Sequence, residues 1–181
     1  DEKWAEHKQR IIETTALEGL YSSSPLRQPP RTRKKWVEAD AVYTEGHKDL
    51  EHLSIFGHMI MDTEESENML DLAKLVTARN GRLLEVGFGL GISATYMQRI
   101  GVEQHAIIDC NCAVMLRMLD VFWPNVSQSG VARVVPILGF WQEVTPILRS
   151  GAFTGVLFDP FPNDDDQLSH EVIHQLPFMP E

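Results

Sequence analysis

The sequence predicts an α/β fold, a parallel β-sheet with helices on both faces. After Gly81, short apolar runs alternate with helical stretches, and this alternation is typical of parallel sheets joined by crossover helices. Four strands are expected, at RLLEV (82–86), HAIID (105–109), ARVVPI (132–137) and TGVLFD (154–159). Helices are expected between them, near 91–100, 112–122 and 141–149. Because the C-terminal ends of parallel strands share one edge of the sheet, we expect ligand-binding residues directly after the strands.

Length and composition favour one soluble globular domain. The chain has 181 residues, of which 43% are hydrophobic and 23% charged, and its formal net charge is −10. The length allows one core, and the apolar fraction is too high for a disordered chain. The most apolar stretch, 105–119, contains Asp109 and Arg117, which argues against a membrane span. The acidic balance argues against nucleic acid as the main partner and is compatible with a small cationic substrate.

The start of the chain and the cysteines bear on targeting and on the redox compartment. The first residues, DEKWAEHKQR, lack the basic start and the apolar run of a secretory signal. The two cysteines, Cys110 and Cys112, are too close in sequence for easy bridging. The cysteine pair favours a reducing compartment, the cytoplasm or also the nucleus, and the chain is expected to be a fragment. The histidines show no metal-ligand spacing, so no metal site is expected.

Residues 1–58 are expected to precede the ligand-binding domain as a helix and a linker. Apolar positions among charges over 1–20 fit an amphipathic helix. The segment 27–36 holds five basic residues around two prolines. A solvated linker is favoured there over a phosphate-binding patch, because prolines oppose a regular helix. The segment 64–81 is helical again and stops at Asn80-Gly81, and the domain is expected to occupy 59–181.

A glycine loop follows the first predicted strand of the sheet. It reads E-V-G-F-G-L-G (85–91) and directly precedes a predicted helix. Gly87 and Gly89 allow a tight turn and a close approach of the backbone to a ligand, because they carry no Cβ. A dinucleotide fingerprint, G-x-G-x-x-G, would need a third glycine at the position of Ile92. The alternative is that these glycines serve only the turn between strand and helix.

The loop spacing, G-x-G-x-G with Glu85 two residues before the first glycine, resembles motif I of the seven-strand S-adenosylmethionine-dependent methyltransferases. An acid at position 85 can bind the ammonium of a methionine moiety directly or through water, and NAD has no such group. Asp109 ends the second strand and is placed to bond two ribose hydroxyls, as NAD would also require. Phe140 and Trp141 follow the third strand, where aromatic rings suit an adenine as well as a core. The spacing therefore favours S-adenosylmethionine over NAD.

Four segments taken together resemble one enzyme family. LEVGFGLG, IIDCN, GFWQEV and GVLFDPFP are similar in order and spacing to guanidinoacetate N-methyltransferase and to the related enzymes that methylate the δ-nitrogen of protein arginine. Upstream, IMDTEE (60–65) resembles the family's V-M-E-R-W-E. The resemblance implies a Rossmann-like class I methyltransferase fold that uses S-adenosylmethionine and releases S-adenosylhomocysteine. The implied acceptor is guanidinoacetate or a close analogue, the chemistry of creatine biosynthesis, and protein arginine is the alternative.

The resemblance also implies which residues form the site. Glu65 and Asp159 would be the two catalytic carboxylates that bind the guanidinium, and Asp159 would accept its proton. Without the resemblance, Glu65 is a helix N-terminal acid and Asp159 a turn residue before proline. The cofactor-binding residues would be Met61, Met69, Glu85, Gly87, Phe88, Gly89, Leu90, Gly91, Asp109, Cys110, Asn111, Phe140 and Trp141.

Two departures from the family pattern concern the identity of the acceptor and the number of strands in the sheet. Glu64 replaces a family Trp and Phe161 a family Tyr, which leaves a different guanidino or amine acceptor open. The family has seven strands, so with four strands the fold is expected to be incomplete at its C-terminal end. TGVLFD is an unbroken apolar run, as expected for a strand flanked by neighbours, and as an edge strand it would be prone to association. We expect truncation, or completion by a homodimer or a second chain; an inactive cofactor-binding partner subunit is the non-enzymatic alternative.

Overall fold

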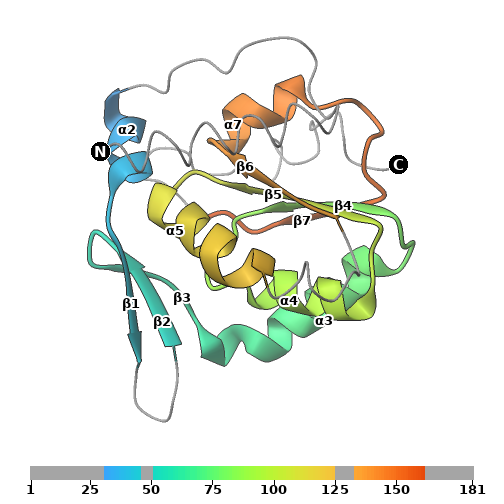
Figure 1. Cartoon of the computed structure of the whole chain (residues 1–181), viewed down its shortest axis with the longest axis horizontal. Helices are drawn as coiled ribbons and strands as arrows, with labels where there is room; N and C mark the ends of the chain where they lie inside the picture. Colours follow the sequence, from blue (N-terminus) through green and yellow to red (C-terminus); the bar gives the residue numbers. More distant parts are fainter. Residues whose placement is uncertain (1–30, 46–50, 125–132, 162–181) are drawn as a thin grey trace.

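Figure 1 shows the computed structural model, which describes residues 31–45, 51–124 and 133–161. A parallel sheet with the strand order β6-β5-β4-β7 forms its centre. The strands are β4 (Arg82–Val86), β5 (Gln104–Asp109), β6 (Arg133–Leu138) and β7 (Gly155–Phe158). The predicted strands and the parallel α/β fold are therefore confirmed. The strand order reverses between β4 and β7, and open α/β sheets bind ligands at such a point.

Helices cover both faces of this sheet. They are α3 (Ser66–Thr77), α4 (Ile92–Ile100), α5 (Cys112–Arg117), which continues as the π-helical turn η2 (Met118–Phe122), and α7 (Trp141–Val144), which continues as η3 (Thr145–Ile147). Figure 1 shows α3 and α4 on one side of the sheet and α7 on the other. Along β4, Leu84 and Val86 pack with Val144 beneath α7, whereas Leu83 packs with Met97 of α4. A strand buried on both faces explains the continuous apolar sequence of β4.

In the described part of the chain, the strand β7 has the single neighbour that a four-strand sheet leaves it, and the expected completion of the sheet stays a prediction. Among the described residues β7 pairs with β4 alone, so it is an edge strand in this part of the chain. Its residues alternate in burial: Gly155 and Leu157 are buried, and Val156 and Phe158 are half-buried. Gly155 allows α3 to approach, because a Cβ at this position would collide with the carbonyl oxygen of Val76.

The N-terminal part contains regular structure that the sequence pattern does not predict. It forms α2 (Arg31–Glu38) and an antiparallel sheet of β1 (Ala41–Glu45), β2 (Glu51–Ile55) and β3 (His58–Asp62), in the order β1-β2-β3. The linker interpretation of 27–36 is therefore wrong from Arg31 onward. The two prolines precede the helix, where a missing N–H is tolerated. The helix expected over 1–20 lies outside the described residues, and the predicted boundary between 58 and 59 falls at the start of β3.

A two-residue turn joins β2 to β3 and explains why this hairpin is hard to recognise. Phe56 and Gly57 both have positive φ, 53° and 75°, which is the backbone that matches the twist of a hairpin. Asn-Gly is the usual sequence of such a turn, and Phe is an uncommon residue at positive φ. The remaining sequence signal for this hairpin is Gly57, which lies between two short segments of alternating polar and apolar residues.

A cationic side chain anchors the small sheet to α5. The guanidinium of Arg117 lies 4.0 Å from the centroid of the Tyr43 ring and forms an ion pair with Glu51. These two contacts join β1 and β2 to the C-terminal end of α5. Within the described ranges, no helix combines the length and the apolar character needed to cross a bilayer.

Candidate active site

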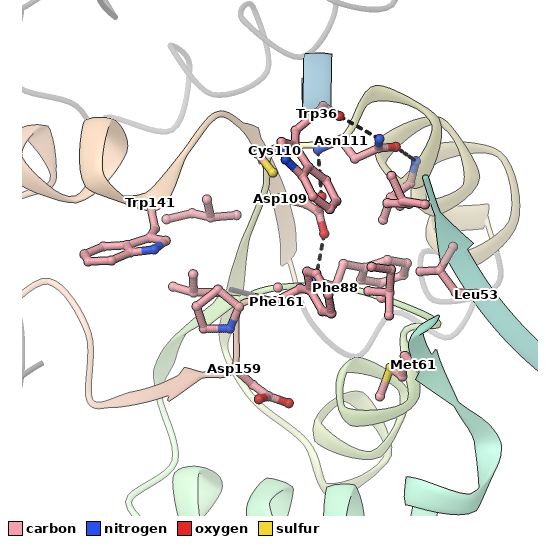
Figure 2. A pocket seen from close by; sticks show the side chains of 18 of the residues that line it. Trp36, Leu53, Met61, Phe88, Asp109, Cys110, Asn111, Trp141, Asp159 and Phe161 are labelled. Carbon is pink, nitrogen blue, oxygen red and sulfur yellow. Dashed lines mark hydrogen bonds between the residues drawn. The ribbon is translucent and has the colours of Figure 1, made fainter. Parts of the chain in front are cut away.

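A pocket opens at the C-terminal edge of the parallel sheet (Figure 2). Four strand ends line it, at 87–89 after β4, 109–111 after β5, 139–142 after β6 and 159–161 after β7. The N-terminal elements supply the facing wall, with Trp36, Leu53, Ile55, Ile60, Met61, Glu65 and Met69. The edge at which the sequence predicts ligand-binding residues is therefore the edge that carries the pocket.

Backbone hydrogen bonds hold the strand ends in register beyond the strands themselves. The N–H of Gly87 donates to the carbonyl of Ile108 at 2.9 Å, and the N–H of Asp159 donates to the carbonyl of Val86 at 3.0 Å. These bonds fix the loops after β4, β5 and β7 relative to one another. Asp159 is consequently held at the end of β4, next to the glycine loop.

The first two glycines of the loop have positive φ and lie close to neighbours on either side. Gly87 has φ +92°, and a Cβ there would lie 2.5 Å from the carbonyl oxygen of Asp159. Gly89 has φ +54°, and its Cβ would lie 2.6 Å from Sδ of Met61. Residues with a side chain rarely adopt such φ values. The loop is thus packed between the end of β7 and the end of β3, so the glycines do more than complete a turn.

Asp109 is oriented by two backbone donors. Its Oδ2 accepts a hydrogen bond from the N–H of Phe88 at 3.0 Å, and its Oδ1 accepts one from the N–H of Asn111 at 2.8 Å. Burial raises the pKa of the Asp109 carboxyl above its usual value, and the backbone N–H groups oppose this shift. The side chain is therefore fixed between the loops after β4 and β5, and its expected contact with a ribose stays a prediction.

This raised pKa predicts how stability depends on pH. The folded protein holds the Asp109 proton at a pH where the unfolded chain has released it, so the stabilising contribution is full below about pH 4 and is lost as the pH rises through the folded-state pKa. We expect the free energy of unfolding of the wild type, relative to Asp109→Asn, to decrease with pH over that window. Urea unfolding at stepped pH measures it, and Asp120→Asn on the exposed side of η2 is the matched control. A difference that increases with pH would contradict the assignment.

Glu85 is not among the residues that line the pocket, and its expected contact with the cofactor ammonium, directly or through water, stays a prediction. Its side chain is 0% exposed; Oε1 accepts a hydrogen bond from the Ser93 hydroxyl, and Oε2 lies 3.0 Å from Nε2 of His105. The other ring nitrogen of His105, Nδ1, lies 3.1 Å from Nε2 of Gln98. A carboxylate without access to solvent needs such partners. Glu85 therefore supports the glycine loop from inside the core, and only Ser93 of this group lines the pocket.

Leu90 and Gly91 also lie outside the pocket lining. The N–H of Leu90 donates to Sδ of Met61 at 3.4 Å, and Gly91 is the N-cap of α4 with φ +73°. A Cβ on Gly91 would lie 2.5 Å from the Phe88 ring. Both residues therefore shape the loop, and the structure gives them no side chain in the site.

The remaining predicted site residues line the pocket together. They are Glu65 and Asp159 from the acceptor group, and Met61, Met69, Gly87, Phe88, Gly89, Asp109, Cys110, Asn111, Phe140 and Trp141 from the cofactor group. Glu65 ends the turn η1 (Thr63–Glu65), where its Oε1 accepts from the N–H of Asp62 at 3.4 Å. Asp159 is exposed. The structure thus brings both carboxylates to one pocket, and their roles toward a substrate stay predictions.

The two aromatic residues after β6 differ in their exposure at the pocket. Phe140 is 3% exposed and belongs to the core, whereas Trp141 is half-buried. The Trp141 ring stands edge-on to Phe158, with centroids 5.0 Å apart and planes at 83°. This contact fixes the indole at the end of the sheet. Its expected role beside an adenine stays a prediction.

Sequence reasoning missed the N-terminal wall of the pocket. Trp36 was expected in a linker, and Leu53 and Ile55 lie on a strand that the pattern does not predict. Trp36 packs against Phe56, with ring centroids 5.2 Å apart, and against Phe161, with centroids 5.8 Å apart. In the sequence, a single Trp at the end of a basic segment is a weak signal for a pocket residue. Its burial in the folded protein reveals its role in the wall.

The sheet order, the glycine loop after β4 and the acid after β5 define a Rossmann-like α/β protein of the methyltransferase class. The family model for guanidinoacetate N-methyltransferase matches residues 26–181, and the chain belongs to this family. It is 33% identical over 134 residues to a protein of Yarrowia lipolytica named protein arginine N-methyltransferase 2, covering 70% of this chain and 27% of that protein. A Candida glabrata protein of the same name is 30% identical over 139 residues, covering 72% and 30%. The chain thus spans less than a third of the length of these curated relatives.

Proposed function

We propose that this protein transfers a methyl group from S-adenosylmethionine to a guanidino nitrogen. The observation that carries this proposal is the meeting of two groups of residues in one pocket. Asp109 and the aromatic residues after β6 suit a nucleoside, and Glu65 and Asp159 suit a cation. Family membership supports methyl transfer as the reaction class.

The pocket fits the proposed cofactor. Gly87 and Gly89 carry no Cβ and line the pocket with backbone. The N–H of Gly87 is held by the Ile108 carbonyl and the N–H of Phe88 by the Asp109 carboxylate, so the loop presents a fixed backbone surface at the sheet edge. The carboxylate of Asp109 is held by Phe88 and Asn111 in one orientation, and it suits a pair of ribose hydroxyls. When bound, S-adenosylmethionine supplies a sulfonium methyl group that a nitrogen lone pair can attack in line.

The two carboxylates perform the tasks that a guanidinium acceptor requires. A planar cation with two N–H edges is aligned by carboxylates through paired, charge-assisted hydrogen bonds. The nitrogen must also lose a proton as the new C–N bond forms, because the cation has no free lone pair. Asp159, at the end of β7 beside the glycine loop, accepts this proton, and Glu65 orients the other edge. Holding the reacting groups in line can contribute roughly 7–11 kcal/mol to lowering the barrier.

The acceptor is proposed to be guanidinoacetate or a close analogue, as the family description names. A second candidate is arginine in a protein, because both curated relatives are named protein arginine N-methyltransferase 2. The same pair of carboxylates suits both acceptors, since each presents a guanidinium. The two proposals therefore differ in the size of the acceptor and agree on the reaction.

A labelled-methyl assay distinguishes these acceptors. We expect label from S-adenosylmethionine to enter guanidinoacetate in preference to free arginine or bulk protein. Label that enters only protein would replace the first candidate with the second. Calorimetry with S-adenosylhomocysteine and with NAD tests the cofactor separately, and tighter binding of NAD would contradict the proposal. If S-adenosylhomocysteine binds but no acceptor is labelled, the inactive partner subunit becomes the better account, and the mass of the purified particle tests for a second chain.

A further inference from the structure

Asn111 connects two parts of the chain that lie far apart in sequence. Its Nδ2 donates hydrogen bonds to the carbonyl of Trp36 at 2.8 Å and to the carbonyl of Ala39 at 2.9 Å. Its Oδ1 accepts from the N–H of Val114 at 3.0 Å, as the N-cap of α5. Figure 2 shows the Asn111 side chain beside Trp36, joined to it by a dashed line.

These contacts leave the Asn111 side chain with no N–H for a ligand. An amide carries two N–H bonds, and both end on buried carbonyls of the N-terminal segment. The side chain is 2% exposed. Although Asn111 lines the pocket and was expected to bind the cofactor, its side chain is committed to holding the segment that contains Trp36.

The held residue, Trp36, forms part of the acceptor side of the pocket. Its side chain is 8% exposed, and its ring packs against Phe161 with centroids 5.8 Å apart. Phe161 follows Asp159 by two residues on the loop after β7, and all three residues line the pocket. Movement of Trp36 would therefore remove a support from the loop that carries the proposed base.

We propose that Asn111 is a positioning residue that holds the Trp36 wall of the pocket in place through its two amide hydrogen bonds. Asn111 acts on the site through Trp36 and Phe161, and its own backbone N–H remains on Asp109. The ligand readouts below rest on the proposed function. The hydrogen-exchange readout in the ligand-free protein does not.

Asn111→Ser separates the two tasks of this side chain. Serine is as good an N-cap as asparagine, so the bond to the Val114 N–H is kept, but its hydroxyl is too short to reach the carbonyls of Trp36 and Ala39. In the whole polypeptide, we expect amide exchange over 36–43 to accelerate about 10- to 100-fold, the change that two ordinary hydrogen bonds give, while exchange in α3 and β4 stays unchanged. We also expect the KM of the acceptor, or the dissociation constant of S-adenosylhomocysteine, to rise at least about threefold.

Thr154→Val is the matched control. The Thr154 hydroxyl also lies between two backbone carbonyls, those of Asn80 and Arg82, at 2.7 and 3.0 Å, but at the opposite edge of the sheet. Its loss should lower stability without changing exchange over 36–43 or ligand binding. Trp36→Leu keeps the backbone carbonyl and removes the indole, so it should raise the same ligand constants as Asn111→Ser. This variant tests the proposal even if Asn111→Ser does not fold.

Each result has a defined meaning. Accelerated exchange confined to 36–43 together with weakened ligand binding supports the proposal. Uniform acceleration, or unchanged ligand constants in both Asn111→Ser and Trp36→Leu, would overturn it and leave Asn111 as a helix cap alone. If the wild type itself fails to bind S-adenosylhomocysteine, the proposed function fails, and the exchange pattern of the ligand-free variant alone decides the role of Asn111.

Discussion

Gly87→Ala is expected to lower kcat/KM for methyl transfer by about 100-fold, because a misplacement of roughly 1 Å in an active site can have that effect. A Cβ at this position would lie 2.5 Å from the carbonyl oxygen of Asp159, and 3.3 Å from Cα of Pro160. Both neighbours are backbone atoms that cannot rotate away. The end of β7 must therefore shift and carry the proposed base with it. Steady-state kinetics with the acceptor found by the labelled-methyl assay measures the effect.

Gly101→Ala separates backbone strain from this collision. Gly101 has φ +101°, close to the +92° of Gly87, but no atom lies within 4 Å of its Cβ position. Both alanines face a similar conformational cost, about 1–3 kcal/mol, and only one of them meets a neighbour. We expect Gly101→Ala to lose stability and keep its activity. Equal activities in the two variants would show that the end of β7 does not determine the reaction geometry.

The parallel sheet was predictable because each strand carries its own local signal. RLLEV and HAIID are short apolar runs bounded by turn residues, and burial on both faces removes any need for polar alternation. The N-terminal sheet was not predictable in the same way. Its hairpin turns at Phe56-Gly57 instead of Asn-Gly, and α2 begins directly after two prolines that suggest a linker. Local sequence signals therefore predicted the parallel sheet and did not reveal the N-terminal elements that form the facing wall of the pocket.

In the candidate site, too, the sequence predicts some features and not others. Position at a strand end is sufficient to place Asp109, Trp141 and Asp159 at the pocket, since parallel strands share one edge. Position alone does not say whether a side chain faces the ligand or the core. Glu85 immediately precedes the last residue of β4, but it lies in the core with Ser93 and His105. Its partners come from elements that the loop motif does not contain, so the motif could not reveal its orientation.

Asp159→Asn is expected to reduce kcat by about 10²- to 10⁴-fold, the usual contribution of a general base. The amide keeps the size of the side chain and its N–H can still bond a neighbour, but it cannot accept the proton that leaves the guanidinium. Affinity for S-adenosylhomocysteine should change by less than about threefold, because the cofactor is proposed to bind Asp109 and the loop after β4. Single-turnover kinetics and calorimetry measure the two quantities separately.

Glu65→Gln tests whether the two carboxylates have different roles. Glu65 stands at the end of η1, and its Oε1 already accepts from the Asp62 N–H, so it is assigned to orient the acceptor. We expect this variant to raise the acceptor KM more than it lowers kcat, whereas Asp159→Asn should do the opposite. Asp120→Asn, an exposed acid on η2 outside the pocket, should change neither constant. If Glu65→Gln abolishes turnover while Asp159→Asn retains it, the roles are reversed. Glu65 is then the base that accepts the proton, and Asp159 orients the acceptor.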